Sequence, residues 1–157
     1  MAPPRWLVDE MLGRLARYLR FVGCDTVYAR DVTDDELIDR AEREGRILLT
    51  RDRELSRRAP HAFRVESPIL ADQWRAVRAA WPDVPTTVRF DRCSLCNGLL
   101  EASDAAGHGS PSPRPGPAQH PSTPTFRCQE CGHLYWDGSH TARIRAQIAA
   151  WEGTRAP

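Results

Sequence analysis

The sequence predicts an α/β fold with a mostly parallel sheet, followed by a small cysteine-rich module. Short apolar runs alternate with amphipathic stretches over the first half of the chain, as strands alternate with covering helices in parallel sheets. Four of the five cysteines then form two Cys-x-x-Cys pairs in the second half. A chain of 157 residues has room for one ordinary domain and a small module.

The first elements are a strand, a helix and a second strand. Residues 6–8 are apolar and predict a short buried strand. Residues 10–22 carry apolar side chains at helical spacing, and Gly23 is a suitable residue to end that helix. The β-branched and aromatic run at 26–29 predicts the second strand.

A second helix and a third strand follow. Thr33 and Glu36 have the spacing of a capping box, which predicts the start of a helix. Gly45 is expected to end this helix. Residues 47–50, Ile-Leu-Leu-Thr, are the clearest strand in the chain.

The predicted α/β domain covers residues 1–82. Residues 63–66 are expected to form a fourth strand and residues 69–80 a helix, with Pro82 as its terminator. Because strands and helices alternate, the predicted sheet is mostly parallel and carries helices on its faces.

The second region is expected at residues 90–140, followed by a C-terminal helix at 141–152. Six of the 13 prolines fall within residues 103–125, among Gly, Ser, Ala and His. Such a segment buries too little apolar surface to offset the entropy of ordering, so we expect a disordered insertion.

Two matching cysteine pairs predict a metal site. The pairs are Cys93 with Cys96 and Cys128 with Cys131. Two Cys-x-x-Cys turns supply the four thiolates of a closed structural zinc site, so we expect zinc to stabilise a ribbon and to perform no chemistry. The long insertion adds little closure entropy because that entropy grows only logarithmically with loop length. Cys24, the fifth cysteine, is interpreted as a core residue.

Acidic side chains follow three predicted strands. Asp9 comes directly after the first strand, Asp31 lies past the second, and Asp52 follows the third. Ligands bind at the carboxyl ends of the strands in open parallel sheets, so these side chains should meet in one crevice. Asp34 and Asp35, at the start of the second helix, are expected to reach the same crevice.

Clustered carboxylates repel one another unless a cation compensates. Mg²⁺ and Mn²⁺ prefer such hard oxygen ligands and can activate water for attack on a phosphodiester. Structural interpretations stay open: Asp34 and Asp35 also suit the first turn of a helix, where the helix dipole favours acids, and Asp31 also suits a turn.

The chain has 22 residues of the Lys and Arg types, and all of them are Arg. Mechanisms that need a lysine are therefore excluded. The formal net charge of +1 indicates no global basic field, but guanidinium groups suit phosphate oxygens. The helix at 10–22 and the segment around Asp52 carry the candidates: Arg14, Arg17, Arg20, Arg51, Arg53, Arg57 and Arg58. A solvated helix face explains those of the first helix equally well.

The composition predicts a soluble protein. The chain is 41% hydrophobic and 27% charged, as in globular proteins. No apolar run approaches the roughly 18 residues of a membrane span, and residues 1–6 lack the apolar core of a secretory signal. We expect a cytoplasmic protein, in which paired cysteines favour metal binding over disulfides.

Several motifs resemble the Mut-seven C-terminal ribonuclease family, which is similar to PIN-domain nucleases. They are Leu-Val-Asp-Glu-Met-Leu-Gly-Arg-Leu-Ala-Arg-Tyr-Leu-Arg at 7–20, Asp-Asp-Glu-Leu at 34–37, Gly-Arg-Ile-Leu-Leu-Thr-Arg-Asp-Arg-Glu-Leu at 45–55, both cysteine pairs, and Tyr-Trp-Asp-Gly-Ser-His at 135–140. The resemblance covers nearly the whole chain.

The resemblance implies a PIN-like three-layer α/β/α sandwich and an endoribonuclease that uses Mg²⁺ or Mn²⁺. Asp9 and Asp52 correspond to two acidic positions of the family, and Asp35 to the middle acid, with Asp34 or Glu36 as substitutes. The substrate would be RNA, contacted by arginines and by the histidine of the Gly-Ser-His motif, His140. A structural role for this histidine stays open, as does the presence of a protein inhibitor or a homodimer.

Two other function classes compete with a nuclease. A non-catalytic RNA-binding or ribosome-associated module would use the ribbon as its contact surface. A phosphoacceptor receiver domain also gathers acids at strand ends, but it needs a lysine, and this chain has none.

Overall fold

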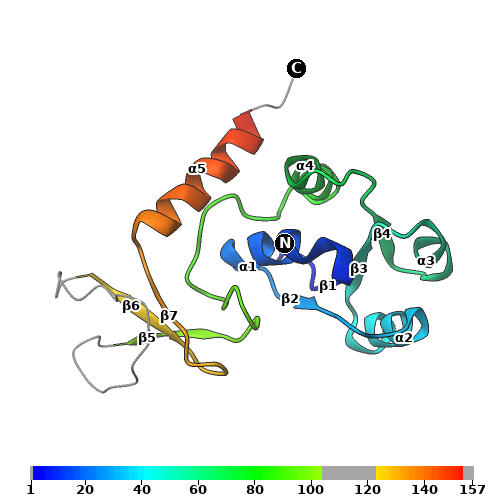
Figure 1. Ribbon diagram of the computed structural model, residues 1–157, viewed down its shortest axis with the longest axis horizontal. Helices are drawn as coiled ribbons and strands as arrows, with labels where there is room; N and C mark the ends of the chain where they lie inside the picture. The colour runs from blue at the N-terminus through cyan, green and yellow to red at the C-terminus, as the bar shows by residue number, and fades with distance from the viewer. Residues whose placement is uncertain (1, 104–122, 154–157) are drawn as a thin grey trace.

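The computed structural model describes residues 2–103 and 123–153. A four-stranded sheet lies between two layers of helices, and a separate three-stranded sheet forms a ribbon beside it (Figure 1). The predicted α/β/α architecture with a parallel sheet is therefore confirmed.

The four strands of the main sheet are all parallel. Their order is β2-β1-β3-β4, and their bounds are β1 Trp6–Val8, β2 Thr26–Tyr28, β3 Ile47–Thr50 and β4 Ala62–Arg64. The chain leaves β1 toward one edge of the sheet and returns to place β3 on its other side. The carboxyl ends of β1 and β3 therefore flank a topological switch point, where α/β folds place ligands.

Helices cover both faces of this sheet. The described helices are the 3₁₀ turn Glu10–Leu12, α1 Gly13–Phe21, α2 Asp34–Glu44, α3 Arg53–Arg58, α4 Leu70–Ala80 and α5 Ser139–Gly153. Helices α1 and α4 lie on one face, whereas α2 and α3 lie on the other (Figure 1). The expected helix at 10–22 is thus a 3₁₀ turn that continues into α1.

Helix α2 begins and ends where its capping residues predict. The Thr33 side chain accepts a hydrogen bond from the Glu36 amide, and the Glu36 carboxylate accepts one from the Thr33 amide. Gly45 closes the helix with a φ of 60°, a left-handed conformation that glycine adopts readily.

The alternation of side chains along β1 divides the interior into two cores. Trp6 and Val8 pack with α1, α4 and α5, whereas Leu7 packs with α2 and α3. All three residues have no exposed surface. A strand that is buried on both faces reads as a continuous apolar run, which is why β1 lacks polar alternation.

The ribbon is an antiparallel sheet in the order β5-β6-β7. Its strands are β5 Leu100–Ser103, β6 Thr125–Cys128 and β7 Leu134–Trp136. Ser103 pairs with Thr125, so both ends of the expected Pro-rich insertion belong to the ribbon. Residues 104–122 of that insertion lie outside the described residues.

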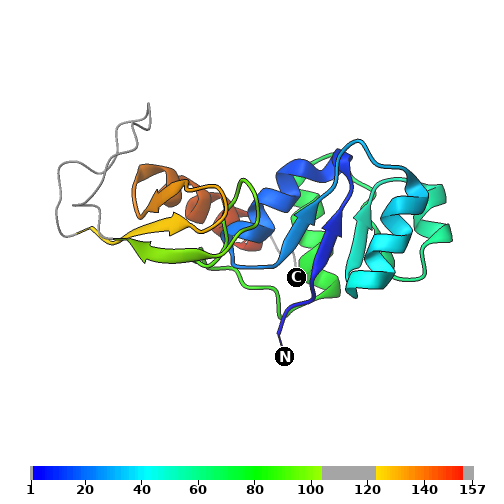
Figure 2. The ribbon, with the colours of Figure 1, turned by 90° about the horizontal axis from the view of Figure 1, so that it is seen from below.

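Helix α5 returns from the ribbon to the α/β domain and completes its core. Ile144, Ile148 and Trp151 belong to the same buried cluster as α1 and α4. The Trp151 ring lies 4.7 Å from the Tyr18 ring and 5.8 Å from the Trp74 ring, measured between centroids. Figure 2 shows α5 behind the ribbon sheet, reaching toward the main sheet.

Among the described helices, none is both long and apolar enough to cross a membrane.

Replacement of Trp151 should therefore destabilise the whole α/β domain. We expect Trp151→Ala to lower the free energy of unfolding by about 3 to 5 kcal/mol, as large buried aromatics do when truncated. Gln147→Ala, on the exposed face of the same helix, is the matched control and should change it little. Urea unfolding followed by circular dichroism measures both. Equal small effects would show that α5 does not contribute to the core.

Candidate functional site

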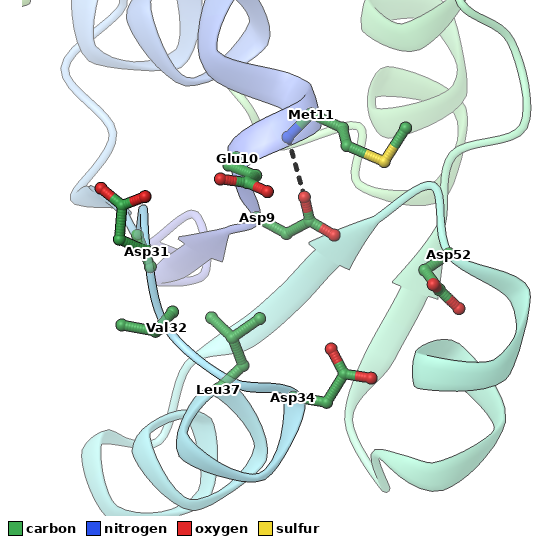
Figure 3. Close-up of a pocket in the computed structure, with 9 residues that line it drawn as sticks. Asp9, Glu10, Met11, Asp31, Val32, Asp34, Leu37 and Asp52 are labelled. Carbon is green, nitrogen blue, oxygen red and sulfur yellow. Dashed lines mark hydrogen bonds between the residues drawn. The ribbon is translucent and has the colours of Figure 1, made fainter.

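A small acidic pocket lies at the carboxyl ends of the parallel strands. Its volume is about 140 Å³, and five of its nine lining residues are carboxylic acids (Figure 3). The lining residues are Asp9, Glu10, Met11, Ala29, Asp31, Val32, Asp34, Leu37 and Asp52. None of them is cationic. Among the ion pairs of the described residues, only that of Arg58 with Asp34, over 3.6 Å, involves a lining carboxylate, so most of the repulsion among the acids is not offset.

Asp9 is the most buried of these acids, with 6% of its surface exposed. Its amide donates to the Leu49 carbonyl over 3.1 Å, which extends the pairing of β1 with β3 by one residue. One carboxylate oxygen accepts from the Met11 amide over 2.8 Å and the other from the Thr50 hydroxyl over 2.5 Å. These contacts fix the carboxylate at the floor of the pocket.

Thr50 connects Asp9 to Asp52. Its hydroxyl donates to Asp9 and accepts from the Asp52 amide over 2.9 Å. The Asp52 carboxylate accepts from the Leu55 amide over 2.9 Å and so caps α3. One threonine at the end of β3 therefore orients two acids from different segments, a role that the sequence analysis did not assign to it.

The structure distinguishes between the two acids at the start of α2. Asp34 lines the pocket, but Asp35 does not. The Asp35 side chain is 80% exposed. Arg58 pairs with both acids, and its guanidinium lies 3.6 Å from the Asp34 carboxylate. Of the two, it is Asp34 whose carboxylate faces the opening shared with Asp9 and Asp52 (Figure 3). The expected middle position, Asp35, is therefore not brought together with the other two acids.

Asp31 also lines the pocket, from the loop after β2. Its φ of 55° is left-handed, a conformation that aspartate tolerates better than most residues. Figure 3 shows its carboxylate apart from those of Asp34 and Asp52.

The carboxylates surround the pocket without touching one another. Among the described residues, only the four paired cysteines bring three or more possible ligand atoms within 4.8 Å of one another. The acids are therefore spaced more widely than a cage made entirely of protein ligands. This spacing still suits Mg²⁺, which commonly keeps several waters and uses only one or two carboxylates together with substrate phosphates.

The predicted substrate-binding arginines differ in exposure. Arg14 and Arg17 are exposed on α1, and Arg53 is exposed on α3, while Arg51 is half-buried. Arg20, expected on the same polar face of α1, is instead buried with 5% of its surface exposed. The expectation was wrong because Arg20 lies one turn after Ala16, at the margin of the apolar face.

His140 lies away from the acidic pocket. It is exposed at the start of α5, and its ring lies 6.1 Å from that of Phe21 at the last turn of α1. Asp9 precedes the opposite end of that helix. A direct contact with a phosphodiester held by Asp9 is therefore not supported by this position.

The four paired cysteines form a compact site between the ribbon strands and the preceding loop. The sulfurs of Cys93 and Cys131 are 3.7 Å apart, and those of Cys96 and Cys128 are 3.4 Å apart. Four thiolates placed about 2.3 Å from a central ion in a tetrahedron would be separated by about 3.8 Å. The chemistry and spacing of these donors thus fit a tetrahedral metal ion.

Tyr135 adds a polar contact to this site. Its hydroxyl lies 3.0 Å from the Cys93 sulfur and accepts from the Ser94 amide over 3.1 Å. Burial alone would raise the pKa of the Cys93 thiol, but hydrogen bonds from Tyr135 and from two backbone amides lower it to about 7. Cys24 belongs instead to the main core, where burial raises its pKa to about 11.

Asp25 joins the ribbon to the α/β domain. Its carboxylate accepts hydrogen bonds from Arg46 over 2.9 Å and from the Asn97 side chain over 2.8 Å. Burial alone would raise the pKa of Asp25, but these hydrogen bonds and the nearby guanidinium groups lower it to about 2. The ionised carboxylate therefore stabilises the folded protein.

The stabilisation by Asp25 should depend on pH. The pKa of Asp25 falls from 3.8 to about 2 on folding. The contribution of its carboxylate to the free energy of unfolding is therefore complete above pH 3.8 and disappears as pH falls through about 2. We expect Asp25→Asn to lower the free energy of unfolding by about 2 kcal/mol at pH 7. Urea unfolding should show this difference shrinking as pH drops below 3.8. Asp83→Asn, at an exposed position, is the control, and a pH-independent deficit for Asp25→Asn would contradict the assignment.

Comparison with known proteins bears on this geometry. No curated protein and no solved structure matches the chain. The family model described as the Mut7-C RNAse domain matches residues 4–148, which include the acidic pocket, both cysteine pairs and most of α5. The chain therefore belongs to the Mut7-C RNAse domain family.

Proposed function

We propose that this protein is a metal-dependent endoribonuclease whose active site is the acidic pocket. The observation that carries the proposal is the set of five carboxylates, without a lining cation, at the carboxyl ends of parallel strands in a chain of an RNAse family. Such a charge distribution favours a divalent cation as counter-ion.

Asp9, Asp34 and Asp52 are the proposed metal ligands. Their oxygens are hard donors, and Figure 3 shows the three carboxylates around one opening. A divalent cation bound there would supply an activated water and would neutralise charge on the phosphodiester. Thr50 and the Met11 amide would hold Asp9 in position, so that ligand orientation does not depend on the substrate.

Arginines beside the pocket are proposed to hold the RNA backbone. Arg53, Arg57 and Arg58 line a second, open hollow on α3, directly after Asp52. Their guanidinium groups match phosphate oxygens and contribute affinity without sequence preference. Arg14 and Arg17, exposed on α1, are proposed as further contacts to the RNA backbone.

The four-cysteine site is proposed to bind Zn²⁺ with a structural role. Its donors already complete a tetrahedron, which leaves no position for a substrate. The ribbon joins α5 to the rest of the chain, so an ordered ribbon helps to position α5 on the core.

A non-catalytic RNA-binding module is the alternative, and one observation favours it. Two exposed leucines lie on the ribbon side of the chain, Leu95 with 54% and Leu99 with 50% of their surface exposed. Exposed apolar side chains of this size suit a contact surface. This alternative predicts RNA binding that does not need the acidic pocket.

Substitution of the acids should separate these functions. We expect Asp9→Asn, Asp34→Asn and Asp52→Asn each to slow cleavage of single-stranded RNA in Mn²⁺ by on the order of 100-fold or more, the typical loss for one group that stabilises a charged transition state. Asn can still accept the hydrogen bonds that Asp9 and Asp52 receive from backbone amides, so the fold should survive.

Asp35→Asn is the matched control because Asp35 neighbours Asp34 but does not line the pocket. It should cleave RNA at nearly the wild-type rate. If neither the wild type nor any variant cleaves RNA above background while all retain RNA binding, the non-catalytic alternative is supported. Equal measurable rates for all five proteins would show that these acids are not the active site. A loss in Asp35→Asn but not in Asp34→Asn would move the middle ligand to Asp35.

Metal removal should unfold the ribbon but not the main sheet. Purified protein should contain about one zinc per chain, because four thiolates complete one tetrahedral site. A strong chelator should lower thermal stability, and added Zn²⁺ should restore it. Elemental analysis and thermal melts measure both effects. Cys128→Ser should lose the zinc because Cys128 is one of the four clustered cysteines. Cys24→Ser should keep the zinc because Cys24 is not part of that cluster.

A further inference from the structure

Helix α1 contains a buried cation that contacts the ribbon. Arg20 has 5% of its surface exposed. Its guanidinium donates to three backbone carbonyls: Thr26 over 2.8 Å, Ser94 over 3.0 Å and Leu95 over 3.1 Å. None of the ion pairs found among the described residues includes Arg20.

A buried cation without an acidic partner needs compensation from another source. Carbonyl dipoles accept three hydrogen bonds from the guanidinium, but they do not neutralise its charge. Ser94 and Leu95 lie between Cys93 and Cys96 in the chain, so the guanidinium sits beside the four-cysteine site. Four thiolates around a divalent ion carry two negative charges in excess. The two charge imbalances have opposite signs and lie next to each other.

We propose that Arg20 is the internal counter-charge of the metal-loaded four-cysteine site, so that metal binding and docking of the ribbon on α1 stabilise each other. This inference rests on the proposal that the four cysteines bind zinc. Arg20 is thereby a positioning residue, because it contacts the turn that carries the ligands and not the metal itself.

Other contacts connect the same turn to the acidic pocket. The Asn97 side chain accepts from the Thr26 amide over 2.9 Å, and Arg20 donates to the Thr26 carbonyl. Thr26 begins β2, whose chain continues to Ala29 and Asp31 in the pocket lining. A loaded site would therefore help to hold the first residue of β2 through both its amide and its carbonyl.

A purely mechanical role for Arg20 makes a different prediction. If Arg20 only ties the turn to α1 through hydrogen bonds, its removal should destabilise the zinc-free and zinc-loaded proteins equally. If it neutralises the loaded site, its removal should destabilise the loaded form more, and the difference must reappear as weaker zinc affinity.

Zinc affinity of the full chain tests the proposal. Competition with a chelator of known affinity gives the dissociation constant for Zn²⁺. We expect Arg20→Met, which keeps the length of the side chain but not its charge, to weaken binding by about 10- to 100-fold, the usual effect of losing an outer contact of a metal site. Arg17→Met, on the exposed part of the same helix, should bind zinc as the wild type does.

Arg20→Lys separates charge from hydrogen-bond geometry and covers the case in which Arg20→Met fails to fold. Lysine keeps the charge but loses the planar fork of donors. A counter-charge role predicts a zinc affinity within a few-fold of wild type for Arg20→Lys. A loss as large as in Arg20→Met would show that zinc binding depends on the hydrogen-bond geometry of the guanidinium and not on its charge, and would overturn the proposal. Thermal melts of each variant, with and without Zn²⁺, measure the coupling independently of RNA cleavage.

The outcomes are distinct. Weaker zinc binding by Arg20→Met, with partial or full recovery in Arg20→Lys, supports the proposal. Unchanged zinc affinity in all folded Arg20 variants overturns it and leaves the zinc site intact. A wild-type chain that binds no Zn²⁺ removes the zinc assignment together with this inference, whatever the result of the RNA cleavage assay.

Discussion

The parallel pairing of β1 with both β2 and β3 is the constraint on which the rest of the structure depends. β1 is short and fully buried, so its position is set by strand neighbours on both sides and by a core on each face. Its last residue is followed at once by Asp9, whose amide continues the ladder onto Leu49. The central acid of the pocket is thus positioned by the sheet itself, not by a mobile loop.

The acids of the pocket combine structural and proposed catalytic tasks. Asp9 accepts from the 3₁₀ turn and from Thr50, and Asp52 caps α3. A carboxylate has about four lone-pair sites, so a capping hydrogen bond leaves capacity for a metal ion. These bonds also restrict the rotation of the side chains, which reduces the entropy lost when a ligand binds. The structural contacts therefore support the proposed metal site and do not compete with it.

Both hydrophobic and electrostatic contacts join the ribbon to the α/β domain. Helix α5 returns apolar side chains to the main core, Asp25 bridges Arg46 and Asn97, and Arg20 reaches the cysteine turn. The first contact is hydrophobic and the other two are electrostatic. Because the electrostatic contacts involve the turn that carries two cysteines, metal occupancy and the position of β2 are connected by the same residues.

Local chain chemistry predicted the four strands of the main sheet, every α-helix except α3, the capping box of α2 and the cysteine pairs, because these depend on periodicity and on spacings within a few residues. Tertiary contacts decided the rest. Adjacent residues on a helix point about 100° apart, so the packing of α2 alone selects Asp34 over Asp35 for the pocket. Arg20 is buried, and α5 joins the main core, because residues distant in the chain cover them. Burial by residues that are distant in the chain produces no periodic pattern in the sequence, so it cannot be predicted from local spacing.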